Sequence, residues 1–278
     1  MLESFIILFR ESFEAALITG IVLSYLNRKG AQEQIRTVWH GVITGIVASL
    51  VIGIAFKLFS FEFEGEAEEI FEGVTMLVTA AMLSSFIIYM IRVKPSVKQI
   101  ESETGEKLGN KWGLFFLVAI SILREGIESV LFLVGLNVNG IEGLIGSLLG
   151  LLVGIGLVYL LFKGFVRLNF KVLFGTTNAL LMLIAAGLVA HGIHELQEAG
   201  VINVLSQTAW DINPAITAEG EYPLLHEKGA IGSIMVSLFG YNGNPSVLEI
   251  VCYVAYLLTV GSAAYLGGAR KSSGEKAA

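Results

Sequence analysis

Seven long apolar stretches, separated by shorter polar segments, follow one another along the chain. They cover residues 2–26, 39–59, 73–91, 112–136, 143–162, 172–196 and 247–266. Each holds about 19 to 25 residues, which is enough for an α-helix to cross the hydrocarbon core of a bilayer. The pattern predicts an all-α, polytopic membrane protein with seven transmembrane helices.

The basic residues predict how these spans are oriented. The polar segments after the first, third and fifth spans and the C-terminal tail are rich in lysine and arginine, whereas the segment after the second span is rich in glutamate. Cytoplasmic loops of membrane proteins carry an excess of lysine and arginine. We therefore expect the N-terminus outside and the C-terminus inside.

Spans one to three resemble spans four to six, which indicates an internal repeat. Spans one and four carry the same charged motif, and spans two and five contain regularly spaced glycines. Three spans per unit is an odd number, so the two units must be inverted in the membrane. We expect one membrane domain composed of repeat one (1–92), repeat two (112–196), an outer loop (197–245), a last helix (246–267) and a cytoplasmic tail (268–278).

The charged motif lies inside an apolar helix in both repeats. It reads Arg-Glu-Ser-Phe-Glu at residues 10–14 and Arg-Glu-Gly-Ile-Glu at residues 124–128. Residues three or four apart share one face of a helix, so the two glutamates of each motif project together. A charge at the middle of a membrane helix costs about 2.5–3.5 kcal/mol. Six such charges indicate a binding site or a transport pathway.

The glutamates of the two motifs are the ligands that hard cations prefer. Carboxylate oxygens suit Fe(III), Mn(II), Mg(II) or Ca(II). Inverted repeats place their substrate site near the bilayer midplane, so we expect four carboxylates to meet there: Glu11, Glu14, Glu125 and Glu128. The charge partners of these glutamates are expected to be Arg10 and Arg124.

The alternative is that each motif is an intrahelical ion pair that only joins helices. In this interpretation Arg10 pairs with Glu14, and Glu11 is left buried without a partner, as is Glu125 in the second motif. Arginine four residues before glutamate is also the less favourable order for such a pair. The repetition of the motif favours the cation site.

Two further groups of residues are candidates for an outer access site. The first is acidic and precedes the third span at helical spacing: Glu68, Glu69 and Glu72. Such a group either attracts cations or is a solvated acidic loop. The second shares one helix face at the outer end of the sixth span: His191, His194 and Glu195. For these histidines, hydrogen bonding at the interface is the alternative to metal binding.

Composition narrows the class of protein. The 278 residues are 54% hydrophobic and 15% charged, with a mean hydropathy of +0.74, which argues against a soluble globular protein. The net charge of −6 is distributed by loop and does not indicate nucleic-acid binding. Cys252 alone can form neither a disulfide framework nor a thiolate metal site. Charged residues near the N-terminus indicate a retained first helix rather than a cleaved signal peptide.

The doubled Arg-Glu-x-x-Glu motif, the seven spans and the three-plus-three repeat resemble the iron permease family, which includes fungal high-affinity iron permeases and bacterial Efe-type iron transporters. Residues 194–201 (His-Glu-Leu-Gln-Glu-Ala-Gly-Val) and the downstream Trp210-Asp211 are closer to the bacterial branch. The resemblance covers essentially the whole chain. The first motif departs from the family pattern, because Ser12-Phe13 stand where a Gly-Leu-like pair is common.

The resemblance implies a multi-pass permease that takes up iron across the plasma (inner) membrane. Iron is then the transported substrate, no cofactor is tightly bound, and the glutamates of both motifs handle the ion. The resemblance also implies an external iron-oxidising or iron-delivery protein as a partner, beside the lipid bilayer. A homo-oligomer stays open.

Three other functions stay open from the residues alone. A carrier for another divalent cation, such as manganese, would use the same oxygen ligands. A membrane-bound carboxylate di-iron oxidase also has paired glutamates, but such sites usually carry Glu-x-x-His on two helices. Here glutamates stand three residues after both Glu11 and Glu125. A structural scaffold is disfavoured by the cost of the buried charges, so we predict a permease and not an enzyme.

Overall fold

The computed structural model describes residues 1–60, 65–92, 97–135, 140–165, 169–214, 222–227 and 229–275. Within these ranges the chain is all-helical, as predicted. Its α-helices are α1 (Leu2–Arg28), α2 (Ile35–Ser60), α3 (Glu66–Arg92), α4 (Val97–Glu106), α5 (Lys111–Gly135), α6 (Gly140–Phe162), α7 (Phe170–Glu198), α8 (Ala230–Phe239) and α9 (Val247–Glu275). A short 3-10 helix at Gln32–Gln34 connects α1 to α2.

Each of the seven predicted spans falls on one long helix: α1, α2, α3, α5, α6, α7 or α9. Residue 136, the predicted end of the fourth span, lies outside the described residues. In the described part, five helices are long and apolar enough to cross a membrane, namely α2, α3, α6, α7 and α9. The other two, α1 and α5, carry the charged motifs in their apolar middle. These helices make the protein a multi-pass membrane protein, and the count of seven crossings stays a prediction.

Two shorter helices lie in segments that the hydrophobic pattern assigned to connections. Helix α4 follows the third span and packs on α1, where Thr104 is fully buried and Arg28 forms an ion pair with Glu101. Helix α8 lies within the predicted outer loop and packs on α7. Residues 215–221 and 228 of that loop lie outside the described ranges. Both short helices therefore pack on the bundle of long helices.

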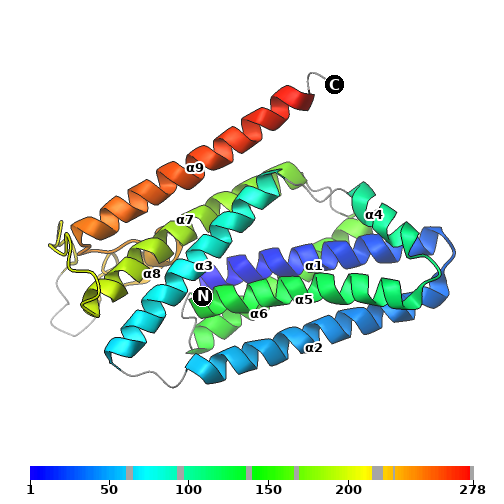
Figure 1. Cartoon of the computed structure of the whole chain (residues 1–278), viewed down its shortest axis with the longest axis horizontal. Helices are drawn as coiled ribbons and strands as arrows, with labels where there is room; N and C mark the ends of the chain where they lie inside the picture. The colour runs from blue at the N-terminus through cyan, green and yellow to red at the C-terminus, as the bar shows by residue number, and fades with distance from the viewer. Residues whose placement is uncertain are drawn as a thin grey trace.

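The long helices pack as three principal pairs, α1 with α6, α2 with α5, and α3 with α7. In Figure 1, α1, α2, α5 and α6 form one group with similar axes, and α3, α7 and α9 form a second group inclined to the first. Successive long helices run in opposite directions, so their connections alternate between the two ends of the molecule (Figure 1). Helix α1 contacts members of both groups.

Glycines allow the paired helices to approach closely. A Cβ atom added to Gly150 of α6 would lie 2.8 Å from the backbone nitrogen of Phe9 in α1. A Cβ atom added to Gly45 of α2 would lie 2.8 Å from the carbonyl oxygen of Ala119 in α5. Neither position can hold a side chain unless the helices separate. Small residues in such places are the usual basis of tight helix packing in membranes.

The α1–α6 and α2–α5 interfaces each pack a serine against a glycine beside a charged motif. The serine belongs to the motif helix in the first interface and to its partner helix in the second. Ser12, the third residue of the first motif, lies against Gly154 of α6, so that a Cβ there would collide with the serine hydroxyl. In the second motif the third residue is Gly126, and it lies against Ser49 of α2. Each interface thus holds one hydroxyl and one glycine at this level.

Apolar clusters lie on both sides of the charged motifs. One cluster joins α1, α3, α5 and α7 and includes Ile7 and Phe132. The other joins α1, α2 and α5 and includes Val22, Leu26 and Val118. Along both α1 and α5 the motif lies between these two clusters. The charges are therefore enclosed by apolar packing at both ends.

We expect Gly150→Ala to lower the stability of the protein by about 1–3 kcal/mol, because the added methyl group overpacks the α1–α6 contact. The matched control is Gly156→Ala on the same helix, where an added Cβ meets nothing within 4 Å. The control should be neutral or slightly stabilising, since alanine is the better helix former. Thermal unfolding of the purified protein in detergent measures both changes. Equal stability of the two variants would contradict the close packing at Gly150.

Candidate cation site

The glutamates of both motifs and Arg10 are largely buried where α1 and α5 face each other. Arg10 and Glu11 are each 1% exposed, Glu125 is 2% exposed and Glu14 is 6% exposed. The side chain of Glu128 is 16% exposed. Carboxylates this deeply buried need partners, because each ion loses several kcal/mol of hydration.

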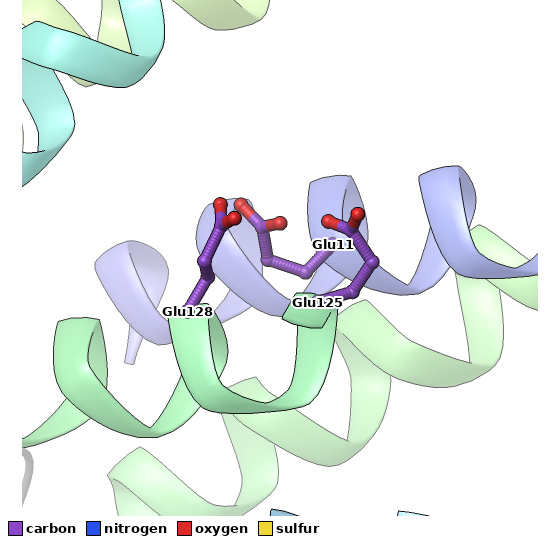
Figure 2. A group of neighbouring side chains, drawn as sticks. All are labelled: Glu11, Glu125 and Glu128. Atoms are coloured by element: carbon purple, nitrogen blue, oxygen red, sulfur yellow. The ribbon is translucent and has the colours of Figure 1, made fainter. Parts of the chain in front are cut away.

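Three glutamates from the two helices come together. One carboxylate oxygen from each of Glu11, Glu125 and Glu128 lies within 4.8 Å of the other two. Figure 2 shows the three side chains reaching the same side of α1 and α5. Oxygens that bind one ion at about 2.0–2.6 Å can be up to about twice that distance apart. The three carboxylates therefore have the spacing of ligands that share a single cation.

Arg10 contacts both glutamates of its own motif. Its Nη1 donates to Glu11 Oε1 at 3.1 Å, and its Nη2 lies 3.1 Å from Glu14 Oε1. The guanidinium group also stacks on the ring of Phe86 in α3, 3.8 Å from the ring centre. A cation over an aromatic face is stabilised further when water is excluded. Arg10 is thus held from three sides.

Arg124 repeats this arrangement in the second motif. Its Nη2 donates to Glu125 Oε1 at 2.7 Å, and its Nε lies 3.4 Å from Glu128 Oε1. The expectation that an intrahelical pair leaves Glu11 and Glu125 without a partner is therefore wrong. The planar guanidinium group has five N–H donors and can contact two carboxylates at once.

Each glutamate of the cluster keeps one oxygen that no protein group contacts by hydrogen bonding. The Oε1 atoms of Glu11, Glu125 and Glu128 face the arginines, whereas their Oε2 atoms are buried without a hydrogen-bond partner. A buried acceptor left unsatisfied costs about 1–3 kcal/mol, and more if it is charged. A bound cation would remove this cost at all three oxygens.

The two arginines differ in their surroundings. Arg10 is buried, whereas the side chain of Arg124 is 51% exposed. The contact with Phe86 accounts for part of this difference, since it covers the Arg10 guanidinium. The second motif is thus the more open half of the cluster, in agreement with the greater exposure of Glu128.

The acidic group before the third span belongs to α3. Glu68 and Glu69 lie in the first turn of this helix, where negative charge is favourable, and Glu72 follows one turn later. Glu195 of α7 lies beside this end of α3, because a Cβ on Gly73 would be 3.2 Å from Glu195 Cβ. The structure therefore places Glu195 with the acidic group of α3.

His194 connects α7 to the start of α9. Its Nδ1 lies 3.0 Å from Glu249 Oε1, and its Nε2 lies 3.5 Å from Glu198 Oε1. Glu249, which is 1% exposed, also accepts hydrogen bonds from Asn242 Nδ2 and from the Ser246 backbone N–H, both at 2.9 Å. Both ring nitrogens of His194 are engaged with carboxylates, which is the geometry of a structural connection.

His191 has different neighbours from His194 and Glu195. Its Nδ1 is 3.0 Å from the Gly187 carbonyl oxygen, and the side chain lines a pocket together with Glu3 and Glu227. Glu3, Glu227 and Glu249 are not among the site residues predicted from the sequence. Glu3 and Glu249 are charged residues at the edges of apolar spans, and this position could have identified them as candidates. Glu227 has no comparable signal in the sequence.

Long apolar helices packed around a buried cluster of carboxylates and arginines are typical of a membrane transport protein. Residues 1–266 match the family described as Iron permease FTR1 family. The chain belongs to this family.

Curated relatives of the chain are named as permeases. The ferrous iron permease EfeU of Yersinia pestis is 32% identical over 265 residues, which cover 93% of this chain and 91% of that protein. The ferrous iron permeases EfeU of Escherichia coli O6:K15:H31 (strain 536 / UPEC) and of Shigella sonnei (strain Ss046) are also 32% identical over 265 residues, covering 93% of each chain. No solved structure matches the chain. The predicted family, its bacterial branch and the prediction of a permease instead of an enzyme are confirmed.

We expect Arg10→Met to destabilise the protein by about 3–5 kcal/mol, because it leaves two buried carboxylates without their counter-ion. Arg124→Met is the matched comparison and should cost less, since the Arg124 side chain is half exposed. Chemical denaturation in detergent measures both losses. Combining Arg10→Met with Glu11→Gln should restore part of the stability, and the absence of any restoration would show that charge balance is not the cause.

Proposed function

We propose that the protein imports ferrous iron across the plasma membrane through the glutamate cluster between α1 and α5. The observation that most directly supports this proposal is a set of three buried Oε2 atoms that no protein donor contacts. They belong to Glu11, Glu125 and Glu128. Membership of the iron permease family supports iron as the substrate. The relatives' name, ferrous iron permease, supports the divalent ion.

The charge balance of the cluster favours a divalent cation. Its four carboxylates and two guanidinium groups leave two negative charges when all are ionised. One divalent ion brings the total to zero, whereas a trivalent ion would leave a positive charge. A net charge enclosed by apolar packing is costly. The charge of the cluster thus suits Fe(II) without a further counter-ion.

The arginines keep the binding of iron reversible. Each glutamate of the cluster has one oxygen toward an arginine and one toward the ion, so the ion shares the negative charge with the guanidinium groups. Glu14, whose Oε1 lies 3.1 Å from Arg10 Nη2, is the fourth carboxylate and exchanges between arginine and ion as iron passes. A site with partly neutralised ligands binds a cation more weakly and releases it more readily.

The helix pairing supports two inverted repeats, residues 1–92 and 112–196. Exchanging the repeats maps α1 onto α5 and α2 onto α6, so the α1–α6 pair becomes the α2–α5 pair, and α3–α7 maps onto itself. The serine–glycine contacts beside the motifs fit the same correspondence, since one lies in the α1–α6 pair and the other in the α2–α5 pair. With the basic segments in the cytoplasm, this arrangement gives seven crossings, the N-terminus outside and the C-terminus inside.

An external iron-oxidising or iron-delivery protein stays an expectation from the resemblance to the family, and a homo-oligomer stays open. A partner of this kind would approach the outer end of the bundle, where α8 and the segment before α9 lie (Figure 1). The acidic first turns of α3 lie at the same end and attract cations to it.

Transport of radioactive Fe(II) into liposomes that hold the purified protein tests this proposal. We expect Glu11→Gln and Glu125→Gln each to lower the initial rate by about tenfold or more, since each removes a ligand charge worth at least about 1.4 kcal/mol. The control is Glu198→Gln, whose side chain is 58% exposed on α7. Manganese and ferric iron are offered as competitors to test selectivity.

Transport at the wild-type rate in both cluster variants, with the proteins folded, would overturn the four-glutamate pathway. Equal inhibition by manganese at the concentration of iron would replace iron with a broader divalent substrate. Loss of transport in Glu198→Gln as well would assign the effect to surface charge.

A further inference from the structure

A cavity lined by side chains that are able to bind metal ions lies near the N-terminal end of α1. Its volume is about 320 Å³, and its walls come from α1, α3, α7, α8 and the segment before α8. The polar side chains in its lining are Glu3, His191, Glu227 and Ser233. This combination of one imidazole with two carboxylates is absent from the glutamate cluster, which has oxygen ligands alone.

The hydrogen bond of His191 prepares its ring for a metal ion. Nδ1 lies 3.0 Å from the carbonyl oxygen of Gly187, and a carbonyl oxygen can only accept. Nδ1 therefore carries the proton, and the lone pair of the neutral ring is on Nε2. Metal-binding histidines in proteins are oriented in this way, with the second nitrogen fixed by a backbone carbonyl or a carboxylate.

Glu227 is fixed by the loop that follows α7. Its Oε1 accepts hydrogen bonds from Asn213 Nδ2 at 3.1 Å and from the Gly243 backbone N–H. Asn213 in turn accepts from the Glu227 backbone N–H through its side-chain oxygen at 3.4 Å. The segments before α8 and before α9 thus hold this carboxylate in the wall of the cavity.

The cavity is in line with the glutamate cluster along α1. Glu3 precedes Glu11 by eight residues, which corresponds to about 12 Å along a helix. The buried Ile7 lies between them and belongs to the apolar cluster that joins α1, α3, α5 and α7. The cavity and the glutamate cluster are therefore separate sites divided by an apolar layer.

The size and spacing of the cavity suit a hydrated ion. Six water molecules occupy about 180 Å³ in liquid water, which is less than the volume of the cavity. Among the described residues, the glutamate cluster is the compact group of three metal ligands, so Glu3, His191 and Glu227 are farther apart than its members. An ion in the cavity would keep part of its water and bind weakly.

We propose that Glu3, His191 and Glu227 form an outer loading site that binds a hydrated divalent transition-metal ion before it reaches the glutamate cluster. The imidazole favours ions such as Fe(II) over Mg(II) and Ca(II), which prefer oxygen alone. The carboxylates supply the negative charge that attracts the ion. Binding of an ion by these residues does not depend on the proposed function. The passage of that ion to the glutamate cluster rests on the proposed function.

Binding of radioactive Fe(II) to the purified protein in detergent, by anaerobic equilibrium dialysis, tests the site directly. We expect two ions per chain in the wild type and one in His191→Ala. Glu227→Gln should weaken binding of Fe(II) to the loading site by about tenfold or more. Glutamine has the shape needed to keep the contacts with Asn213 and Gly243. His40→Ala on α2, where the histidine is exposed, is the matched control and should bind two ions.

Transport in liposomes then separates loading from passage. His191→Ala should raise the KM for Fe(II) by about tenfold and leave the maximal rate within about twofold, because the cluster is intact. Unfolding temperatures of all variants are measured beside the wild type. Unchanged binding and unchanged KM in both His191→Ala and Glu227→Gln would overturn the loading site.

The outcome for the cluster is read separately in the variant Glu11→Gln with Glu125→Gln. One ion bound by this variant, and lost again on adding His191→Ala, supports the loading site even where transport through the cluster fails. No ion bound by the cluster variant would overturn the loading site and leave the proposed function in place.

Discussion

Six charged side chains inside two apolar helices need charge partners within the protein, and the arrangement of the bundle follows from this constraint. In each motif one arginine contacts both glutamates, which leaves one negative charge per helix when all three groups are ionised. The remaining negative charge is enclosed by apolar clusters on both sides. The close pairs α1–α6 and α2–α5 cover the outer sides of the motif helices and keep the two motifs against each other.

The division of the carboxylate oxygens relates this constraint to transport. If arginine satisfied both oxygens of every glutamate, the cluster would be a stable ion-pair network with no affinity for a substrate. If no arginine were present, a bound cation would be held too tightly for passage. One oxygen of each cluster glutamate faces arginine and the other is unpaired, so in the proposed pathway the same residues would provide both stability of the protein and reversible binding.

Much of the fold could be predicted from the sequence, because hydrophobic length alone determines the positions of the seven long helices. Helix α4 was not predicted, since it is short and polar and its stability depends on its contact with α1. The motif residues were correctly expected to share a helix face, but the contact of Arg10 with Glu11 depends on the length and rotamer of arginine. Sequence spacing does not contain that information.

The other site residues show the same limit. Three residues of the sixth span were grouped because they are three or four apart, yet His191 lines a cavity, His194 contacts Glu249, and Glu195 lies beside α3. Their partners come from segments far away in the chain. Periodicity can place a side chain on a face of its helix, whereas the neighbour of that face is decided by tertiary packing.

The exchanged serine and glycine beside the motifs have a consequence for the evolution of the chain. Ser12 can occupy its position because Gly154 lies opposite, and Gly126 is required because Ser49 lies opposite. Neither residue is free to change alone, and a tolerated change needs a second one on another helix. The space available to Ser12 in the first motif therefore depends on a glycine of α6. Comparing one half of the sequence with the other shows different residues at this position, although each of the two interfaces holds one serine against one glycine.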